Sequence, residues 1–377
     1  MKILYVTTIG CTMNFFKNLI NELIDAGHTV DIATNTTDSP VDECYSEWGC
    51  KIYPISCTRS PLNKSTLKAV KEIEQIVSQN HYDIVHCHTP IAAMCTRLAC
   101  KKFRKNGGKV FYTAHGFHFY KGAPFKNWLL YYPIEKICSY FTDTLITINK
   151  EDFNFAKNHL NAKSTQYVAG VGIDVKRFSD VQISKAEKRK ELGIPENAIL
   201  LASVGELNKN KNHQVILRAM AQLKNNNLYY IIAGKGKNAD NLLSLAKKLG
   251  LENNFNLLGE RTDIPEIYKA SDICCFPSIR EGLPVAVMEA MAAGLPIVSG
   301  DNRGSRDLCE NGINGFLCSP FDAQEFTKAI HTITNDMELF ENISNNNSLI
   351  AQKFDYSIIN KSMLDFYGIN SMLVSKK

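Results

Sequence analysis

The sequence lacks the features that mark several large classes of protein. Its twelve cysteines include no C-x-x-C pair and no cluster with histidine at zinc-ligand spacing, so a structural zinc site is not indicated. No apolar run reaches the roughly 20 residues of a membrane-spanning helix. The best candidate, residues 128–132, is soon interrupted by Glu135 and Lys136. The G-x-G-x-x-G pattern of dinucleotide enzymes and the P-loop are both missing, which excludes those two nucleotide-binding classes.

The cysteines that are present point to a reducing compartment. Most lie in apolar surroundings, as Cys87, Cys274 and Cys275 do, so we expect reduced thiols within a core and a cytoplasmic location. Met1 and Lys2 lead directly into an apolar strand pattern, which predicts no signal peptide.

The positive charge is concentrated in the first half of the 377 residues. Residues 1–178 carry 21 Lys/Arg against 15 Asp/Glu, whereas residues 179–377 carry 22 against 23. The excess includes residues 101–105, Lys109, Lys121 and Lys126. It indicates either a solvated helix end or a face that rests on an anionic membrane surface. No nucleic-acid-binding motif accompanies it, so we expect no nucleic acid partner.

Apolar runs and helical periodicity alternate along both halves, which is typical of parallel sheets covered by helices. We therefore predict an α/β protein with domains at 1–178 and 179–353 and a final helical segment at 354–377, the polar stretch 178–195 forming the boundary. Strands are expected at 3–7, 29–34, 51–55, 84–87, 110–113, 144–148, 166–168, 199–204, 229–233, 255–257, 273–276, 297–298 and 316–318. Helices are expected at 13–26, 66–79, 91–104, 125–141, 151–159, 211–224, 239–249, 264–270, 285–293 and 354–373, and a loop or helix end at 345–347.

The segment 278–296 carries the most informative pattern. Glu281 and Glu289 stand eight positions apart, separated by a Gly-Leu-Pro turn and a short helix. Pro284 suits the first helical position, and Gly294 followed by Pro296 predicts the helix end. The backbone N–H groups of Gly282, Leu283 and Val285 would then lie at a helix start, which is a favourable seat for phosphate. Carboxylates on either side of that seat can accept hydrogen bonds from sugar or ribose hydroxyls.

This arrangement resembles the E-x7-E signature of the retaining glycosyltransferases of family 4, the group 1 glycosyl transferases. Glu-Gly-Leu-Pro, Glu-Ala-Met-Ala-Ala-Gly and Asn-Gly-Ile-Asn-Gly follow one another in the expected order between residues 281 and 315. The resemblance extends over nearly the whole chain. It implies the GT-B fold, in which two Rossmann-like domains face each other across a cleft and the last helix crosses back to the first domain.

Other turns that follow predicted strands match the same family. Thr-Ala-His-Gly at 113–116 implies that His115 lies beside the donor sugar, although a histidine bonded to a backbone carbonyl is an alternative for that position. His118 is a weaker candidate. His86 and His88 border the acceptor or stabilise the turn before Pro90. Without a third ligand in the sequence they do not form a metal site.

The second half carries the turns that resemble the donor site. Lys211 matches the lysine that contacts the donor diphosphate, and a lysine ammonium suits phosphate. Glu206 stands where the family usually has arginine, so we expect its side chain to turn away or to bind a sugar hydroxyl, while Lys209 or Arg280 compensates. The remaining positions that resemble donor-binding turns are Gly10, Gly234, Gly236 and Arg261.

Three further positions carry alternatives. Asp263 follows the turn of Arg261 and is alternatively the N-cap of the next helix. Residues 172–174 with Phe178 resemble the family's hinge, and residues 303–307 either help the sugar site or form a structural loop.

The resemblance implies transfer of a sugar from a nucleotide-sugar with retention of configuration, by front-face attack without a protein nucleophile. Glu281 is assigned to the donor-sugar hydroxyls and Glu289 to the ribose, while Lys211 and the helix N–H groups stabilise the leaving diphosphate. No Asp-x-Asp motif is present, and we expect neither a metal nor another cofactor. Closure of the two domains is expected to exclude water.

Within the family, the segments 116–125 and 205–213 resemble the capsule and exopolysaccharide branch. There the donor is commonly a UDP-sugar and the acceptor a sugar on polyprenyl diphosphate, which suits a protein bound peripherally to the inner face of the cell membrane. The aromatic and basic stretch 117–132 is the candidate membrane contact. Two other functions stay open, a UDP-N-acetylglucosamine epimerase on the same architecture and a non-catalytic nucleotide-sugar-binding partner.

Overall fold

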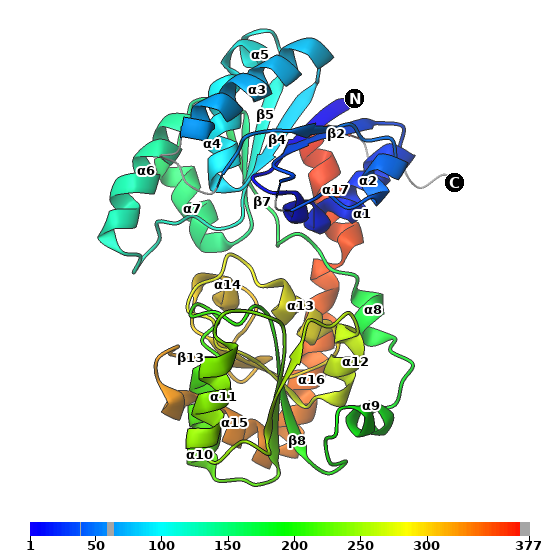
Figure 1. The fold of residues 1–377 in the computed structure, drawn as a ribbon, viewed down its shortest axis with the longest axis vertical. Helices are drawn as coiled ribbons and strands as arrows, with labels where there is room; N and C mark the ends of the chain where they lie inside the picture. The colour runs from blue at the N-terminus through cyan, green and yellow to red at the C-terminus, as the bar shows by residue number, and fades with distance from the viewer. Residues whose placement is uncertain (38, 59–63, 370–377) are drawn as a thin grey trace. The chain divides into compact units, whose positions relative to one another are not determined.

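The computed structural model describes residues 1–37, 39–58 and 64–369 (Figure 1). The chain forms two compact units, which we describe separately. Unit 1 comprises Met1–Val171 together with Tyr356–Lys377, and unit 2 comprises Gly172–Asp355. The chain thus passes between units at 171–172 and 355–356, where the sequence predicts boundaries at 178–179 and 353–354. The polar stretch 178–195 lies inside unit 2 and contributes α9 (Lys185–Glu191).

Unit 1 is built on a parallel sheet with the strand order β3-β2-β1-β4-β5-β6-β7. The sequence order reverses between β1 and β4, which makes the carboxyl ends of these strands the expected binding edge. The strands are β1 (Lys2–Val6), β2 (Thr29–Thr34), β3 (Ile52–Pro54), β4 (Ile84–His88), β5 (Lys109–Ala114), β6 (Thr144–Thr147) and β7 (Ser164–Tyr167). The helices are η1 (Gly10–Phe16), α1 (Lys17–Asp25), α2 (Cys44–Glu47), α3 (Lys64–Asn80), α4 (Pro90–Ala99), α5 (Lys101–Lys105), α6 (Phe125–Ser139), α7 (Lys150–His159) and α17 (Tyr356–Tyr367).

Unit 2 repeats this plan with the order β10-β9-β8-β11-β12-β13, again all parallel, and its reversal lies between β8 and β11. Its strands are β8 (Ile199–Val204), β9 (Leu228–Ala233), β10 (Phe255–Gly259), β11 (Ile273–Phe276), β12 (Ile297–Gly300) and β13 (Gly315–Cys318). Besides α9 its helices are α8 (Val175–Ser179), α10 (Gln214–Leu223), α11 (Ala239–Lys248), α12 (Ile264–Ala270), α13 (Val285–Ala292), α14 (Arg303–Arg306), α15 (Ala323–Asn335), α16 (Met337–Ala351) and η2 (Gln352–Phe354).

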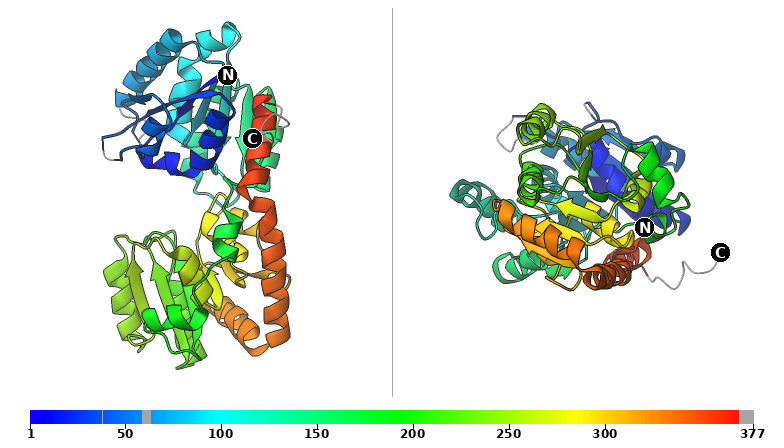
Figure 2. Two further views of the ribbon diagram at one scale, coloured as in Figure 1. Left: turned by 90° about the vertical axis from the view of Figure 1, so that its right-hand side faces the viewer. Right: turned by 90° about the horizontal axis from the view of Figure 1, so that it is seen from below.

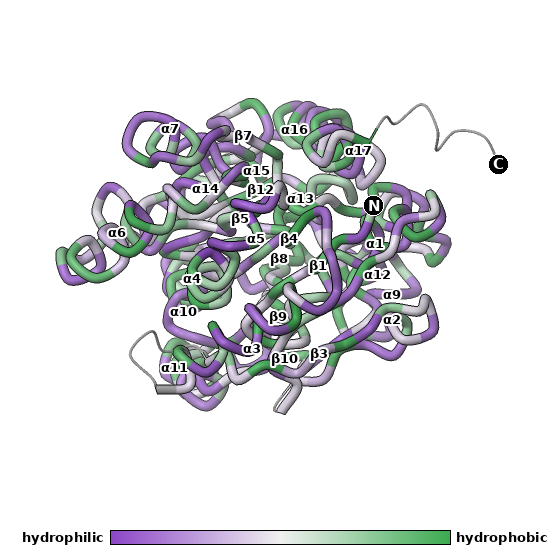
Figure 3. Tube along the Cα trace, turned by 90° about the horizontal axis from the view of Figure 1, so that it is seen from above, coloured by the Kyte–Doolittle hydropathy of each residue, from purple (hydrophilic) through white to green (hydrophobic). Residues whose placement is uncertain are grey.

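The parallel arrangement follows from the composition of the strands. Central strands such as β4 and β11 are buried along their whole length, as expected when helices cover both faces of a sheet. Figure 3 shows polar and apolar segments alternating along the outer helices, as expected for helices that cover a sheet with one side only. Each of the thirteen predicted strands is found, so the predicted α/β class with two Rossmann-like domains is confirmed.

The last described helix, α17, belongs to unit 1 although it follows unit 2 in the sequence. It lies beside the first strands and helices of the chain (Figure 2, left). There the Asn360 side chain donates hydrogen bonds to Asn18 and Glu22 on α1. The predicted helix extended to 373, and residues 370–373 lie outside the described part of the chain.

Some predictions of local structure were wrong. Residues 345–347 lie inside α16 rather than in a loop, because Asn347 is buried and its amide donates to the carbonyl oxygens of Leu295 and Asn314 and accepts from the Asn314 side chain. Buried hydrogen bonds here outweigh the low helix propensity of asparagine. The helix predicted at 211–224 begins only at Gln214, since Asn212 has a φ of 53° and Lys211 belongs to a loop.

All twelve cysteines are unpaired, and ten of them are buried. Across the described ranges, the helices are too short or too polar to cross a membrane.

Candidate functional site

The loops that follow β8 and β11 bring an ion pair to the binding edge of unit 2. The ammonium of Lys211 lies 2.8 Å from a carboxylate oxygen of Glu281, and both side chains are partly exposed. Lys211 Nζ also lies 4.5 Å from the centre of the Phe276 ring, at the end of β11. Two residues 70 positions apart are thus held as a pair, with the aromatic ring limiting the mobility of the lysine.

Asn210 fixes this pair from the backbone side. Its amide donates to the carbonyl oxygen of Arg280 at 3.0 Å, and its own carbonyl oxygen accepts from the Ile279 N–H at 2.8 Å. The residues on either side of the ion pair are therefore joined by two hydrogen bonds. Asn210 was not predicted as a site residue, and its only signal in the sequence is its position immediately before Lys211.

The start of α13 lies immediately after Glu281. Pro284 occupies the N-cap, with ψ of 115°, rather than the first helical position predicted for it, and Val285 begins the helix. Within the described part of the chain, the N–H groups of Gly282, Leu283, Val285 and Ala286 donate to no acceptor. These N–H groups and the helix dipole form a positive terminus suited to an anion. Gly294 ends the helix as predicted, with φ of 75° and hydrogen bonds typical of a Schellman motif.

Glu289 projects from the second turn of α13 and is only partly exposed. Burial raises the pKa of its carboxyl group to about 7, and the charge of Arg177 opposes this shift. No described residue donates a hydrogen bond to this carboxylate. A carboxylate in this state is available to accept hydrogen bonds from a ligand, and its charge changes close to neutral pH.

Gly234 and Gly236 are explained by the packing of two backbones. A Cβ atom on Gly234, whose φ is 153°, would lie 2.0 Å from the carbonyl oxygen of Gly205. A Cβ on Gly236 would lie 2.4 Å from the carbonyl oxygen of Leu207. The loop after β9 thus supports the loop that carries Lys211, and the structure shows these glycines in a supporting role.

Arg303 and Asn302 support the other side of the site. The Arg303 side chain is buried and donates to the carbonyl oxygen of Glu281 at 3.2 Å. Asn302 caps α14, and its amide donates to the carbonyl oxygen of Ser278 at 3.0 Å. Of the two roles considered for residues 303–307, this geometry favours the structural one.

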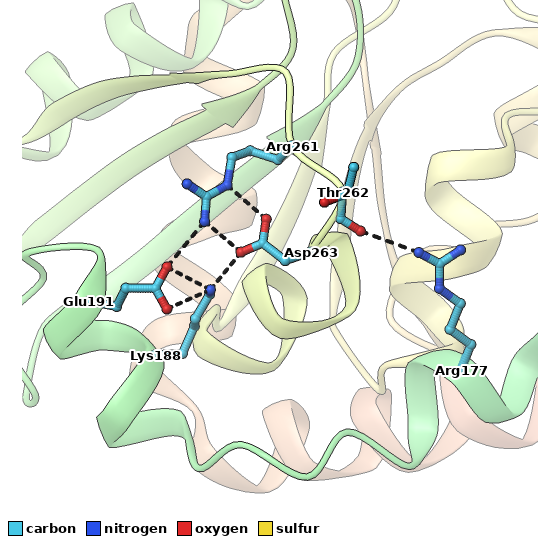
Figure 4. Close-up of polar contacts among 6 residues, drawn as sticks. All are labelled: Arg177, Lys188, Glu191, Arg261, Thr262 and Asp263. Atoms are coloured by element: carbon cyan, nitrogen blue, oxygen red, sulfur yellow. Dashed lines mark hydrogen bonds and ion pairs between the residues drawn. The ribbon is translucent and has the colours of Figure 1, made fainter.

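Arg261 lies in a cluster of charges rather than pointing to an open surface (Figure 4). Its guanidinium pairs with Asp263 at 2.5 Å and with Glu191 on α9 at 3.1 Å, and Lys188 completes the cluster. Asp263 occupies the N-cap of α12, as one prediction had it, but its side chain makes no capping hydrogen bond because it is engaged by these cations. The pKa of Asp263 is lowered, first by its hydrogen bond with Arg261 and then by its hydrogen bond with Lys188.

Glu206 points into solvent from the loop after β8. Its exposed position accords with the expectation that its side chain turns away. Lys209 is also exposed, and Arg280 is partly exposed.

In unit 1, β4 and β5 bring two histidines together at the binding edge. His115 follows the end of β5, and its Nε2 lies 3.1 Å from Nδ1 of His88, the last residue of β4. Burial lowers the pKa of His115 to about 4 and holds the pKa of His88 well below its usual value, so both rings are neutral at physiological pH. His115 thus bonds to a side chain, not to the backbone carbonyl considered as its alternative.

His86 is a structural residue. Its two ring nitrogens lie 2.6 Å from the Tyr367 hydroxyl and 2.8 Å from the Thr113 hydroxyl, and the side chain is fully buried. Tyr367 also bonds to the Tyr5 hydroxyl at 2.6 Å. Through these bonds α17 is attached to β1 and β4. Because both nitrogens of His86 are engaged, it has none left for a ligand.

Gly10 is required by a close approach of the chain. A Cβ at this position would lie 2.1 Å from the carbonyl oxygen of Ser39. Beside this turn, a cavity of about 250 Å³ lies between the β1 loop, the start of α4 and α6. It is lined by Thr8, Ile9, Thr12, Thr89, Pro90, Ile91, His118 and Tyr131. The His118 and Tyr131 rings pack with centres 4.6 Å apart.

No group of three or more His, Cys, Asp or Glu side chains in the described ranges is arranged to hold a metal ion. Lys211 and the start of α13 supply positive charge beside Glu281.

Comparison with known proteins places both units in one family. Residues 2–149 match the "Glycosyl transferase 4-like" model and residues 184–349 match "Glycosyl transferases group 1". EpsD of Bacillus subtilis (strain 168) is 38% identical over 348 residues, or 91% of this chain and 89% of EpsD. The UDP-Gal:alpha-D-GlcNAc-diphosphoundecaprenol alpha-1,3-galactosyltransferase of Escherichia coli is 30% identical over 293 residues, covering 76% and 75%.

Solved structures agree on the fold. Anabaena Alr3699/HepE in complex with UDP gives a TM-score of 0.80 at 22% identity, over 98% of this chain and 100% of that one. WaaG, a glycosyltransferase involved in lipopolysaccharide biosynthesis, gives 0.76 at 18% identity, over 98% and 100%.

Proposed function

Because this chain belongs to the group 1 glycosyl transferases and is a glycosyltransferase, we propose that it transfers a hexose or N-acetylhexosamine from a UDP-sugar to a saccharide on polyprenyl diphosphate. The transfer retains the anomeric configuration and requires no metal. Its product serves capsule or exopolysaccharide synthesis. The observation that carries the proposal is the Lys211–Glu281 pair beside the N–H groups at the start of α13 that have no acceptor among the described residues.

Each part of the donor is assigned to a feature of unit 2. Lys211 and the N–H groups of Gly282, Leu283 and Val285 bind the diphosphate and stabilise the charge that develops on it as the bond to the sugar breaks. Glu281, held by Lys211, accepts from the sugar hydroxyls, and Glu289 accepts from the ribose. The backbone around Arg261 receives the base, with Arg261 itself holding that loop through Asp263 and Glu191.

Three glycines and one histidine complete the donor assignment. Gly234 and Gly236 allow the Lys211 loop to take its position. Gly10 keeps the turn after β1 compact, and His115 contacts the donor sugar. The UDP assignment is supported by HepE, whose structure was solved with UDP and with UDP-glucose, and by the UDP-Gal named for the E. coli relative.

The acceptor is assigned to the cavity between β1, α4 and α6. Thr8, Thr12 and Thr89 line a volume of about 250 Å³ beside the start of the ten-residue helix α4, which is large enough for a sugar. The aromatic pair of His118 and Tyr131 offers a flat surface of the kind that sugars stack on. Support from relatives comes from the E. coli enzyme and from a Campylobacter jejuni N-acetylgalactosaminyltransferase, both named for diphospho-undecaprenol acceptors.

Helix α6 is the proposed contact with the anionic membrane surface. Phe125, Leu129 and Ile137 are 79%, 69% and 58% exposed and recur every four or eight residues, so they form one stripe along the helix. Lys126 lies on the same helix, and Lys101 lies 4.3 Å from the Phe141 ring just beyond its end. Apolar side chains flanked by cations suit the interface of an anionic membrane.

The structure limits which residues of the predicted membrane contact, the stretch 117–132, are able to reach a membrane surface. Phe117 and Phe119 are buried in the core, so the stretch 117–132 cannot bind lipid as a whole. The stripe instead continues past it to Ile137. Glu135, on the opposite face, forms a buried ion pair with Arg97 at 2.8 Å, and this pair fixes α6 on α4 beside the acceptor cavity.

Vesicle sedimentation tests this surface. Phe125→Ser/Leu129→Ser/Ile137→Ser should reduce binding to phosphatidylglycerol vesicles by about tenfold or more, since each buried apolar side chain contributes roughly 1.5–3 kcal/mol. The matched control is Phe321→Ser/Met337→Ser/Leu349→Ser in unit 2, which changes three residues of similar exposure. Equal loss in both variants would remove α6 from the proposal.

A transfer assay read by mass spectrometry tests the reaction. UDP- and GDP-sugars are mixed with N-acetylhexosamine on polyprenyl diphosphate, with Glu289→Ala as the control. A gain of one sugar by the acceptor, absent in the control, confirms the proposal and identifies the donor. Donor binding without transfer favours a nucleotide-sugar-binding partner, and an isomerised free donor favours an epimerase.

A further inference from the structure

His88 is a buried histidine with one polar partner. Only 1% of its surface is exposed, and its ring packs between Tyr5, at 5.4 Å between ring centres, and Phe16, at 4.1 Å. Nδ1 lies 3.1 Å from His115 Nε2, while Nε2 of His88 is buried and has no hydrogen-bond partner in the described part of the chain. Among the described residues, the hydrogen bond with His115 is therefore the one polar contact of the His88 ring.

The hydrogen bond between two neutral imidazoles allows two arrangements. In the first, His88 Nδ1–H donates to His115 Nε2, so that the proton of His115 is on Nδ1. In the second, His115 Nε2–H donates to His88, and the proton of His88 is then on Nε2. The two arrangements present opposite groups at His115 Nδ1, a donor in the first and an acceptor in the second.

Burial distinguishes the two arrangements. The second leaves a buried N–H donor of His88 without an acceptor, whereas the first leaves only an unused lone pair there. Unpaired buried N–H groups are the rarer of the two in folded proteins. Both arrangements keep the rings neutral, in keeping with the pKa values that burial lowers, so the cost of an unpaired buried N–H group decides between them.

We propose that His88 is a positioning residue that holds His115 in the Nδ1–H tautomer, so that His115 acts as a hydrogen-bond donor and not as a general base. Within the proposed function, on which this inference rests, His115 then donates to an oxygen of the donor, either a sugar hydroxyl or a phosphate oxygen. His88 itself touches no substrate, because its ring is enclosed by Tyr5, Phe16 and His86.

The tautomer can be measured without any assay of transfer. In protein labelled with ¹⁵N-histidine, long-range ¹H–¹⁵N spectra distinguish a protonated ring nitrogen from an unprotonated one. The His115 signals are assigned by their loss in His115→Gln. The inference expects Nδ1 of His115 to be protonated and Nε2 to be the acceptor. Protonated Nε2 overturns it, whatever reaction the protein catalyses, so this result is independent of the proposed function.

Variants of His88 test the consequence for activity. In His88→Asn the amide nitrogen takes the place of Nδ1 and can still donate, whereas His88→Leu fills the apolar space without a donor. We expect kcat/KM to fall roughly 10- to 100-fold in the Leu variant, as for other residues that orient a functional side chain, and to fall only a few fold in the Asn variant. Equal activity of wild type and His88→Leu, with thermal unfolding unchanged, overturns the proposal. If the Leu variant does not fold, the spectrum of the wild-type protein decides.

Discussion

The binding edges of the two units use opposite kinds of chemistry on the same architecture. Both lie at the carboxyl ends of parallel strands, where the strand order reverses. In unit 2 the edge is charged, with Lys211, Glu281 and the start of α13 in one place. In unit 1 it is neutral, with His88 and His115 desolvated and threonine hydroxyls nearby.

The difference shows how one fold can divide a reaction between its halves. A diphosphate needs fixed positive charge, and a helix start with a lysine supplies it. Sugar hydroxyls need directional hydrogen bonds, which neutral imidazoles and hydroxyls supply without attracting the wrong anion. Substitutions that remove the charge of one edge or the hydrogen bonds of the other should therefore have different signatures.

The largest effect is expected for Lys211→Ala. It removes the ammonium from the diphosphate and leaves Glu281 without its partner, so we expect kcat/KM to fall by about 10²- to 10³-fold. Lys235→Ala is the matched control, because Lys235 is an exposed lysine of unit 2 that pairs with Glu260 at 2.9 Å. Steady-state kinetics of both variants give the answer, and equal activities would show that the charge of Lys211 has no part in the reaction.

His115→Ala should affect the neutral edge with a smaller loss, roughly 10- to 100-fold in kcat/KM, the usual range for one hydrogen bond made to a reacting substrate. If His115 is a donor rather than a base, the loss should be similar at pH 6 and pH 9. Rate measurements at both pH values check this. A loss confined to one end of the range would identify a proton-transfer role and end the contrast drawn between the two edges.

Glu289→Gln should change the pH dependence of donor binding. Because burial raises the pKa of Glu289 to about 7, the carboxylate forms only as the pH rises through 7, and ribose binding should strengthen over that range. Calorimetry with an intact UDP-sugar, whose phosphates have no ionisation near pH 7, should show this dependence in wild type and none in Glu289→Gln. UDP is unsuitable because its terminal phosphate titrates near pH 6.

Glu289→Gln should also change how the stability of the protein depends on pH. Donor binding by wild type should strengthen as the pH rises, whereas its stability should fall. A carboxyl group whose pKa is higher in the folded state stabilises the fold below its unfolded pKa and loses that contribution as the pH rises through about 7. Glu289→Gln should therefore match wild type in thermal unfolding at pH 5 and exceed it at pH 8. Equal differences at both pH values would mean that Glu289 is not desolvated.

The smallest effect is expected for Arg261→Ala. Its ion pairs are partly exposed, at 30% for the arginine side chain and 24% for that of Asp263, so their loss should lower the free energy of unfolding by only about 1 kcal/mol. Donor KM should rise a few fold because the loop at 259–263 is held less firmly. Lys235→Ala again serves as control, and a loss above 100-fold in kcat/KM would place the Arg261 side chain on the donor itself.

Sequence patterns predicted the fold because its rules are local. Strands such as β2, β8 and β11 were predicted at their observed limits, since fully buried parallel strands are short apolar runs bounded by turns. The errors arose where a distant partner decides, as for Asn347, whose helix is favoured by bonds to Leu295 and Asn314. Propensity cannot include hydrogen bonds between residues far apart in sequence.

Candidate site residues were predicted where a sequence motif marks them. The partners and the burial of these residues were not predicted. Glu281 and Lys211 were both named, yet only the structure shows them 2.8 Å apart. Gly234 and Arg261 were named for the donor, and the structure shows one accommodating a neighbouring backbone and the other in an ion cluster. Asn210, which joins the two loops of the site, has no signal in the sequence beyond its position before Lys211.

By itself the sequence determined the α/β architecture, the family and the residues at the strand ends. The spacing of apolar residues, the turn residues and the motif spacing are all local properties of the sequence. Only the tertiary structure decided that His86 is internal, that His88 lies against His115, and that burial raises the pKa of Glu289 to about 7. Burial and pairing set these properties, and both depend on which distant segments the fold brings together. The chemistry of a side chain is fixed by its residue type, but its protonation and its partners are fixed by its surroundings.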